Sequence, residues 1–221
     1  MTLRRYDLIV FDWDGTLIDS AAKIVRCFQS AAREAGLVPP ADSEVRNIIG
    51  LGLKEALDTL LPAADEASRN RVIECYRHHF MNLDETETPL FPGVLEGLTK
   101  LSEAGFQLAI ATGKARRGLD RALRETAVSH YFCATRCADE ARSKPHPQML
   151  HDLLGFTGVA TERALMVGDT TYDLQMAFAA AMGSVAVTYG AHERDRLLSH
   201  NPLGCFDSFA NVCQWLEATA G

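Results

Sequence analysis

Short and nearly continuous apolar segments recur along the chain, and segments with helical periodicity separate them. Strands covered on both faces have such continuous apolar runs, whereas strands with one wet face alternate between apolar and polar residues. The pattern predicts strands at Leu8–Phe11, Phe106–Ala111, Leu165–Val167 and Val185–Tyr189, with a weaker one at Tyr131–Ala134. It predicts helices at Val94–Ala104, Arg116–Thr126, His146–Leu154 and Leu174–Ala181. Because strand and helix alternate, we expect an α/β fold with a doubly wound parallel sheet.

One long stretch departs from this alternation. From about Ser20 to Asp84 the sequence has only helical patterns, at Ser20–Ala35, Glu44–Ile49, Lys54–Leu61 and Asp65–Leu83. A strand-free stretch of this length is the size of a small domain, so we expect a helical-bundle cap at residues 18–87, inserted after the first strand. Residues 1–17 and 88–221 then form the core, and the polar Asp84–Thr88 leads back to it through the turn Phe91-Pro92-Gly93.

Composition and charge narrow the class of protein. The 221 residues carry a formal net charge of -7, with a pI near 5.5. This balance argues against a general nucleic-acid binder, because such proteins neutralise phosphates with clustered Lys and Arg. No apolar run reaches the roughly 18 residues that span a bilayer, and no signal peptide precedes the first apolar segment. We therefore expect a cytoplasmic monomer or homodimer with no membrane or nucleic-acid partner.

The six cysteines are scattered along a chain that is large enough to fold without disulfides, so we expect reduced thiols. Cys133 and Cys137 have a spacing that could bind one metal ion. However, no second pair of Cys or His lies nearby to complete a tetrahedral site. We interpret both as buried thiols.

The stretch Phe11-Asp12-Trp13-Asp14-Gly15-Thr16 follows the first predicted strand. Open α/β sheets bind their ligands at the C-terminal ends of the strands. Asp12 and Asp14 are two residues apart, so in extended backbone both carboxylates leave on the same side. The alternative explanation is a turn or helix-cap role, since Asp and Gly are common turn residues.

Polar residues also follow three later apolar segments. Thr112 and Gly113 follow one strand, Lys144 lies in a loop before Pro145, and Asp169 follows another strand with Asp173 four residues further on. Each alone could be a helix cap or a solvated loop charge. Their joint placement at one edge of one sheet is not expected of independent caps, so we interpret them as one site.

In these motifs the chain resembles the haloacid dehalogenase-like hydrolase superfamily, in its phosphoglycolate phosphatase-like subgroup with a helical cap after the first strand. The resemblance covers nearly the whole chain and implies a Rossmann-like core with Mg²⁺-dependent phosphatase activity on a small phosphorylated metabolite. Four motifs match in order, namely Asp12-Trp13-Asp14-Gly15-Thr16, Thr112-Gly113, Lys144-Pro145 and Gly168-Asp169-Thr170-Thr171-Tyr172-Asp173.

The resemblance and the charges agree on a cation. Four carboxylates in one cleft would repel an anionic phosphate unless a cation joined them. Hard oxygen donors suit Mg²⁺, which keeps waters and contacts substrate phosphate. The metal ligands that the resemblance implies are Asp12, the backbone carbonyl of Asp14, and Asp169, with Asp173 in a supporting role.

The same resemblance implies that Asp12, Asp14, Thr112 and Lys144 are catalytic. Asp12 would attack phosphorus to give an aspartyl-phosphate, and Asp14 would protonate the leaving oxygen and then activate water. Thr112, Gly113 and Lys144 would hold the phosphate oxygens. Asp14 also argues against a dehalogenase, because a halide leaves without a proton.

Substrate choice is expected to depend on the cap. Arg46, in a stretch with a Gly-rich turn, could bind a substrate carboxylate, although a solvated helix charge explains it equally well. Among relatives the pattern looks most like enzymes that act on 2-phosphoglycolate. Pyrophosphatases, sugar phosphatases, nucleotidases and a β-phosphoglucomutase-like mutase remain alternatives. A non-catalytic phospho-ligand-binding domain is the alternative of another class, and the presence of Asp12, Asp14, Lys144 and Asp169 argues against it.

Overall fold

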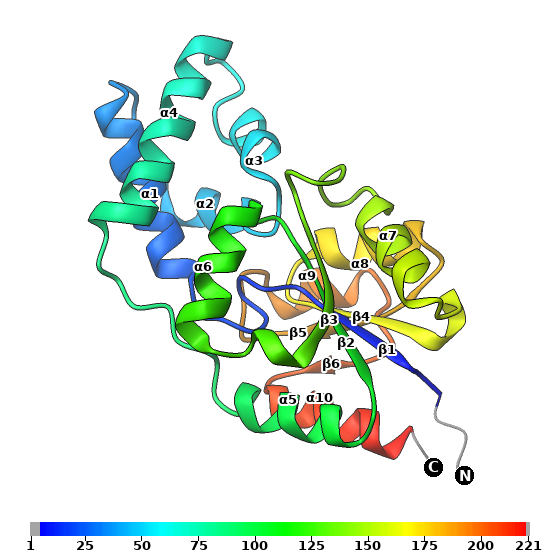
Figure 1. The fold of residues 1–221 in the computed structure, drawn as a ribbon. Helices are drawn as coiled ribbons and strands as arrows, with labels where there is room; N and C mark the ends of the chain where they lie inside the picture. The colour runs from blue at the N-terminus through cyan, green and yellow to red at the C-terminus, as the bar shows by residue number, and fades with distance from the viewer. Residues whose placement is uncertain (1–4, 220–221) are drawn as a thin grey trace.

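A six-stranded parallel sheet organises the computed structural model, which describes residues 5–219 (Figure 1). Every neighbouring pair of strands is parallel, and their order across the sheet is β3-β2-β1-β4-β5-β6. The predicted α/β fold with a Rossmann-like parallel sheet is therefore confirmed. The strands are β1 (Leu8–Phe11), β2 (Gln107–Thr112), β3 (Phe132–Cys137), β4 (Ala164–Gly168), β5 (Gly183–Val187) and β6 (Cys205–Phe206).

Both faces of the sheet are covered by helices, which explains the continuous apolar runs. Successive side chains of a strand point to opposite faces. In β1, Ile9 and Phe11 pack in one hydrophobic cluster, whereas Leu8 and Val10 pack in another. Helices α5 (Val94–Glu103), α6 (Arg116–Thr126) and α10 (Phe209–Ala218) contribute to the first cluster, and α7 (Gln148–Thr157) and α8 (Thr171–Ala179) to the second. The short helix α9 (Arg194–Leu198) follows β5.

The segment between β1 and α5 is helical and has its own apolar core. Figure 1 shows its helices grouped beyond the sheet, on the side of α6. Residues such as Phe28, Val45 and Leu57 form a cluster separate from those that flank the sheet. This separation supports our proposed division into core and cap. The elements are α1 (Ala21–Glu34), α2 (Asp42–Ile48), α3 (Leu53–Leu60), α4 (Glu66–His78) and the π-helical turn η1 (His79–Leu83).

The two segments that join cap and core are hydrogen-bonded to each other. The Asp19 amide donates to the Pro89 carbonyl at 2.8 Å, and the Phe91 amide donates to the Leu17 carbonyl at 3.0 Å. The ammonium of Lys23 donates to the carbonyl of Asp84 at 2.8 Å. Entry and return segments therefore form one double-stranded connection beside the first strand.

The sequence pattern missed elements at the end of the chain and misplaced some boundaries. β6 has two residues, too few to give a pattern, and α9 and α10 were not predicted. Two 3₁₀ turns, η2 (Ser129–Tyr131) and η3 (Thr161–Arg163), precede β3 and β4. No helix within residues 5–219 is both long and apolar enough to cross a membrane.

The two cysteines with metal-like spacing differ in exposure. Cys137 is buried, as predicted, but Cys133 is exposed, so its interpretation as a buried thiol was wrong. Burial raises the pKa of Cys137 to about 12, which leaves it a neutral thiol at ordinary pH. Both are free thiols in the structure.

Candidate active site

The loop after β1 turns sharply beneath the cap and carries both Asp12 and Asp14. The Trp13 amide lies 2.6 Å from Asp12 Oδ1. Gly15 has a positive φ of 86°, and a Cβ atom there would lie 2.2 Å from Asp169 Oδ2. Only glycine fits this position without displacing the carboxylate, which accounts for the Gly in this motif.

Three buried carboxylates meet at this loop: Asp12 and Asp169 follow β1 and β4, and Asp173 lies in the first turn of α8. Oxygens of Asp12, Asp169 and Asp173 lie within 4.8 Å of one another. The Thr16 hydroxyl donates to Asp169 Oδ1, and the Ala191 amide donates to Asp169 Oδ2, both at 2.7 Å. The expected gathering of Asp12, Asp169 and Asp173 is thus present in the described structure.

Lys144 lies inside this acidic centre and is only 1% exposed, so it is not a solvated loop charge. Its ammonium is 2.7 Å from Asp12 Oδ1 and 2.6 Å from Asp173 Oδ1. Asp173 also closes a capping box at the start of α8, because its Oδ2 accepts from the Thr170 amide at 3.1 Å. One residue therefore caps a helix and holds the buried lysine.

The charges of this centre fit a bound cation. Burial and the neighbouring carboxylates raise the pKa of Asp12, although Lys144 opposes this. Burial and Asp173 raise the pKa of Asp169 to about 7. Asp12 Oδ2 is buried and has no hydrogen-bond partner among the described residues. An excess of buried carboxylate with an unpartnered oxygen is the environment that a hard divalent cation stabilises.

Asp14 lies beside this centre, and neighbouring side chains hold its carboxylate. The Ser20 hydroxyl donates to Asp14 Oδ1 at 2.7 Å. The ammonium of Lys114 lies 3.0 Å from the same oxygen and 4.6 Å from the centroid of the Phe80 ring in the cap. Sequence reasoning missed Lys114, although its position directly after Thr112 and Gly113 is a signal that could have identified it.

Thr112 and Gly113 lie where β2 ends. They line a pocket between cap and core that Asp12 and Asp14 also line. The Thr112 hydroxyl accepts from the Lys114 amide at 3.1 Å, within its own loop. It is not the N-cap of α6, which is Ala115. A Cβ atom on Gly113 would lie 2.5 Å from the carbonyl oxygens of Gly50 and Leu51 in the cap. Gly113 thus permits close contact between the cap and the core.

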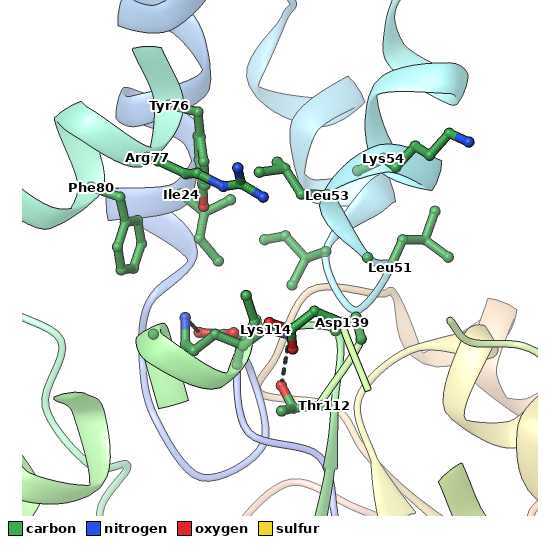
Figure 2. Close-up of a pocket in the computed structure, with 18 of the residues that line it drawn as sticks. Ile24, Leu51, Leu53, Lys54, Tyr76, Arg77, Phe80, Thr112, Lys114 and Asp139 are labelled. Carbon is green, nitrogen blue, oxygen red and sulfur yellow. Dashed lines mark hydrogen bonds and ion pairs between the residues drawn. The ribbon is translucent and has the colours of Figure 1, made fainter. Parts of the chain in front are cut away.

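The pocket between cap and core does not include Arg46. Arg46 is exposed on α2 and is not among the residues that line the pocket. The cap arginine that lines it is Arg77, whose side chain points into the cavity in Figure 2. The expectation that Arg46 contacts substrate is therefore corrected. The loop Ile49–Leu51, which follows Arg46 in the sequence, does line the pocket.

A second missed residue, His192, joins the core to the cap. Its Nδ1 accepts from the Thr171 amide at 3.0 Å, and its Nε2 lies 3.1 Å from the Asn47 carbonyl. The Tyr172 hydroxyl donates to the same carbonyl at 2.9 Å. Burial lowers the pKa of His192 to about 4, so the ring is neutral and donates through Nε2. A lone histidine after the last predicted strand gave no signal of this contact.

A parallel α/β core with an acidic centre beneath a helical cap defines the class of protein, and comparison with known proteins defines its family. The model of the family "Haloacid dehalogenase-like hydrolase" matches residues 9–187. The chain belongs to this family. The resemblance stated from its motifs is confirmed, and so is the expectation of a hydrolase.

Curated relatives align over most of the chain. A protein of Dickeya dadantii named "Probable phosphatase IndB" is 36% identical over 213 residues, which covers 93% of this chain and 91% of the relative. The "Phosphoglycolate phosphatase" of Agrobacterium fabrum is 33% identical, and the alignment covers 83% of this chain and 81% of that relative. The "Phosphoglycolate phosphatase" of Colwellia psychrerythraea is 29% identical, and the alignment covers 95% of this chain and 96% of that relative.

Solved structures share the fold. The crystal structure of a predicted phosphoglycolate phosphatase from Haemophilus somnus superposes on this chain with a TM-score of 0.85 at 25% identity. It covers 96% of this chain and 98% of that one. Nearly the whole chain therefore has the same fold as this solved structure.

Proposed function

We propose that this hydrolase cleaves phosphate monoesters by in-line attack of the Asp12 carboxylate on phosphorus. The main support for this proposal is the difference between the contacts of the two Asp12 carboxylate oxygens. Its Oδ1 is held by Lys144 at 2.7 Å, while its Oδ2 is buried without a partner among the described residues. A carboxylate fixed on one side and unpartnered on the other has the arrangement of an oriented nucleophile or a metal ligand.

Mg²⁺ is the cation that these ligands favour. Asp12, Asp169 and the backbone carbonyl of Asp14 would hold it, and Asp173 would support the site through Lys144. When bound, the ion would neutralise the carboxylates and accept an oxygen of the substrate phosphate. The oxygen-only donor set and the raised pKa of Asp169 support this assignment.

The residues then divide the chemistry between two half-reactions. Asp12 forms a bond to phosphorus as the bond from phosphorus to the alcohol oxygen breaks, and Asp14 gives that oxygen its proton. Asp14 next removes a proton from water, which attacks the aspartyl-phosphate and releases inorganic phosphate. The Lys144 ammonium balances the charge on the transferring oxygens, and the Thr112 hydroxyl donates a hydrogen bond to one of them. Ser20 and Lys114 keep Asp14 in place through both steps.

For the substrate, the names of relatives make 2-phosphoglycolate the first compound to test. Several relatives that align over more than four-fifths of this chain carry the name phosphoglycolate phosphatase. The other activities open from the sequence, on pyrophosphate, sugar phosphates and nucleotides, belong in the same assay. So does a mutase, which would transfer the phosphoryl group to a sugar instead of water.

The test is phosphate release with and without Mg²⁺ by the wild type and by Asp12→Asn. We expect Mg²⁺-dependent turnover that falls about a thousandfold or more in the variant, because it keeps the shape of the side chain but removes the nucleophile. Asp152→Asn on α7, outside the pocket, is the matched control and should retain wild-type rates. Wild-type activity in Asp12→Asn would contradict the proposal. If neither the wild type nor the two variants released phosphate from any compound, a non-catalytic binding domain would be favoured.

A further inference from the structure

The cavity above Asp12 is much larger than the reacting phosphate needs. Its volume is about 610 Å³, and it extends from Asp12, Asp14 and Thr112 up to α4 and η1 of the cap. Pockets of about 300–1,000 Å³ are typical of sites for ligands of drug size. A phosphate with a two-carbon acid would therefore leave most of this volume to water.

The cavity is not a gap left by an open cap. The Gly52 amide donates to the Ser143 hydroxyl at 2.7 Å, across the boundary between cap and core. The carbonyls of Gly50 and Leu51 are so close to Gly113 that a Cβ atom there would lie 2.5 Å from them. The cavity therefore has this volume even though the cap is in contact with the loops of the core.

The cap side of the cavity is an apolar wall with a row of aromatic rings. Ring centroids of Phe28 and Tyr76 are 4.3 Å apart, and those of Tyr76 and Phe80 are 5.7 Å apart. Leu53 of α3 faces the same space in Figure 2. Contact of such a wall with water is unfavourable, and burial against an apolar ligand face removes that cost.

Two polar groups enter the cavity between these apolar side chains. Figure 2 shows the Arg77 guanidinium and the Tyr76 hydroxyl directed into the space, whereas Lys54 points away from it. Neither Arg77 nor the Tyr76 hydroxyl has a hydrogen-bond or ion-pair partner within residues 5–219. Burial raises the pKa of Tyr76 well above its usual value, so its hydroxyl stays a neutral donor. Both groups can therefore donate to acceptors on a ligand.

We infer that the site takes a phosphate monoester whose alcohol carries a ring with an apolar face, of about nucleoside size. The ring packs on Phe28, Tyr76 and Phe80, and an acceptor on it meets Arg77. This inference rests on the proposed phosphatase activity and deepens it. It also makes 2-phosphoglycolate a poorer substrate than a ring-bearing ester, because glycolate leaves the aromatic row uncovered.

The first test compares kcat/KM for four primary alkyl phosphates with similar leaving groups. These are uridine 5′-monophosphate, benzyl phosphate, glycerol 1-phosphate and 2-phosphoglycolate. We expect a ring-bearing ester to exceed both ring-free ones by about tenfold or more, the scale that apolar pocket contacts supply. A preference for uridine monophosphate over benzyl phosphate would assign the ring to a nucleoside, and the reverse to an aryl group.

The contrary outcomes are distinct. A kcat/KM for 2-phosphoglycolate or glycerol 1-phosphate equal to or above that of the ring-bearing esters would overturn this inference and leave the proposed activity intact. No turnover of any of the four, or of the other phosphates assayed, would overturn both.

The second test changes the wall itself. Leu53→Asn places an amide in the cavity and should lower the ratio of kcat/KM for benzyl phosphate to that for 2-phosphoglycolate by about fivefold or more. Leu95→Asn is the matched control, because Leu95 is 48% exposed on α5 and lies outside the cavity. It should change neither value. An unchanged ratio in Leu53→Asn, with thermal unfolding like that of the control, would contradict the inference.

Discussion

Lys114 joins the proposed acid–base residue to the cap. Its ammonium contacts Asp14 at 3.0 Å and stands 4.6 Å from the centroid of the Phe80 ring. An ammonium between a carboxylate and an aromatic face interacts favourably with both. The motifs selected the residues that we propose act on phosphorus. The place of Lys114 directly after Thr112 and Gly113 could have added it to that set, but its contact with Phe80 depends on how the cap folds against the core. Contacts that form only when distant segments fold together leave no pattern in the sequence.

At this residue we predict that Lys114→Met lowers kcat by about tenfold, because the Asp14 carboxylate loses the charged partner that fixes its position. Steady-state kinetics at saturating substrate measures the effect. Lys100→Met, at an exposed position of α5, is the control and should leave kcat unchanged. An unchanged kcat in Lys114→Met would show that Ser20 alone is enough to hold Asp14.

At the scale of elements, the best predicted parts are a strand that is buried along its whole length and a helix with sharply separated polar and apolar faces. Helix α6 was predicted at its observed bounds, Arg116–Thr126, and β1 likewise at Leu8–Phe11. The pattern placed β3 at Tyr131–Ala134, but the strand runs from Phe132 to Cys137. The prediction stopped too early because most side chains of β3 are half-buried and Thr135 and Arg136 in its second half are polar. Arg46 was predicted to bind substrate because it precedes a glycine turn in the sequence. In the structure it is exposed on α2 and does not line the pocket.

The turn at Gly50–Leu51 in the cap lies directly against the loop at Gly113 in the core. We predict that Gly113→Ala raises KM and lowers kcat/KM by about tenfold or more, because its Cβ would collide with two cap carbonyls and push the cap away. Kinetics and thermal unfolding should be measured together. Gly155→Ala, where a Cβ meets nothing within 4 Å, is the control and should leave the kinetics unchanged and stabilise α7 slightly. Wild-type kinetics in Gly113→Ala would mean that this contact is not needed for binding.

At the scale of the whole molecule, two large hydrophobic clusters and a small one at Leu174, Ala186 and Leu197 flank the sheet within residues 5–219, and another fills the cap. Such a division is readable from the sequence, because the periodicity of apolar residues changes where the chain leaves the sheet. The contacts that join the two parts are mainly backbone carbonyls with polar side chains. His192, for example, links Thr171 of α8 to the Asn47 carbonyl of the cap. These links have no apolar periodicity, so the pattern could not predict them.

This histidine should make stability depend on pH. Its Nδ1 accepts from the Thr171 amide, so protonation would place two donors face to face. Burial lowers its pKa to about 4 in the folded protein, against about 6.5 when unfolded. The unfolded chain binds the proton first, so this contribution is fully present above pH 6.5 and is lost as the pH falls toward 4.

We therefore predict that acidification from pH 7 to pH 4 costs the wild type about 1–3 kcal/mol more of unfolding free energy than it costs His192→Gln. Urea denaturation at a series of pH values measures this difference. His151→Gln, at an exposed position of α7, should follow the wild type. Parallel pH profiles for the wild type and His192→Gln would contradict the assignment of a neutral buried ring.

The most direct test of the account is to look for the phosphoryl group on Asp12. Wild type, Asp14→Asn and Asp12→Asn are mixed with Mg²⁺ and a cleaved ester, quenched in acid within the first turnover, and analysed by peptide mass spectrometry. We predict one phosphoryl group on Asp12 in the wild type and a longer-lived one in any Asp14→Asn protein that becomes phosphorylated, because Asp14 activates the water. Asp12→Asn should carry none. Turnover without a phosphorylated enzyme, or a phosphoryl group on another residue, would contradict the central claim that Asp12 is the nucleophile.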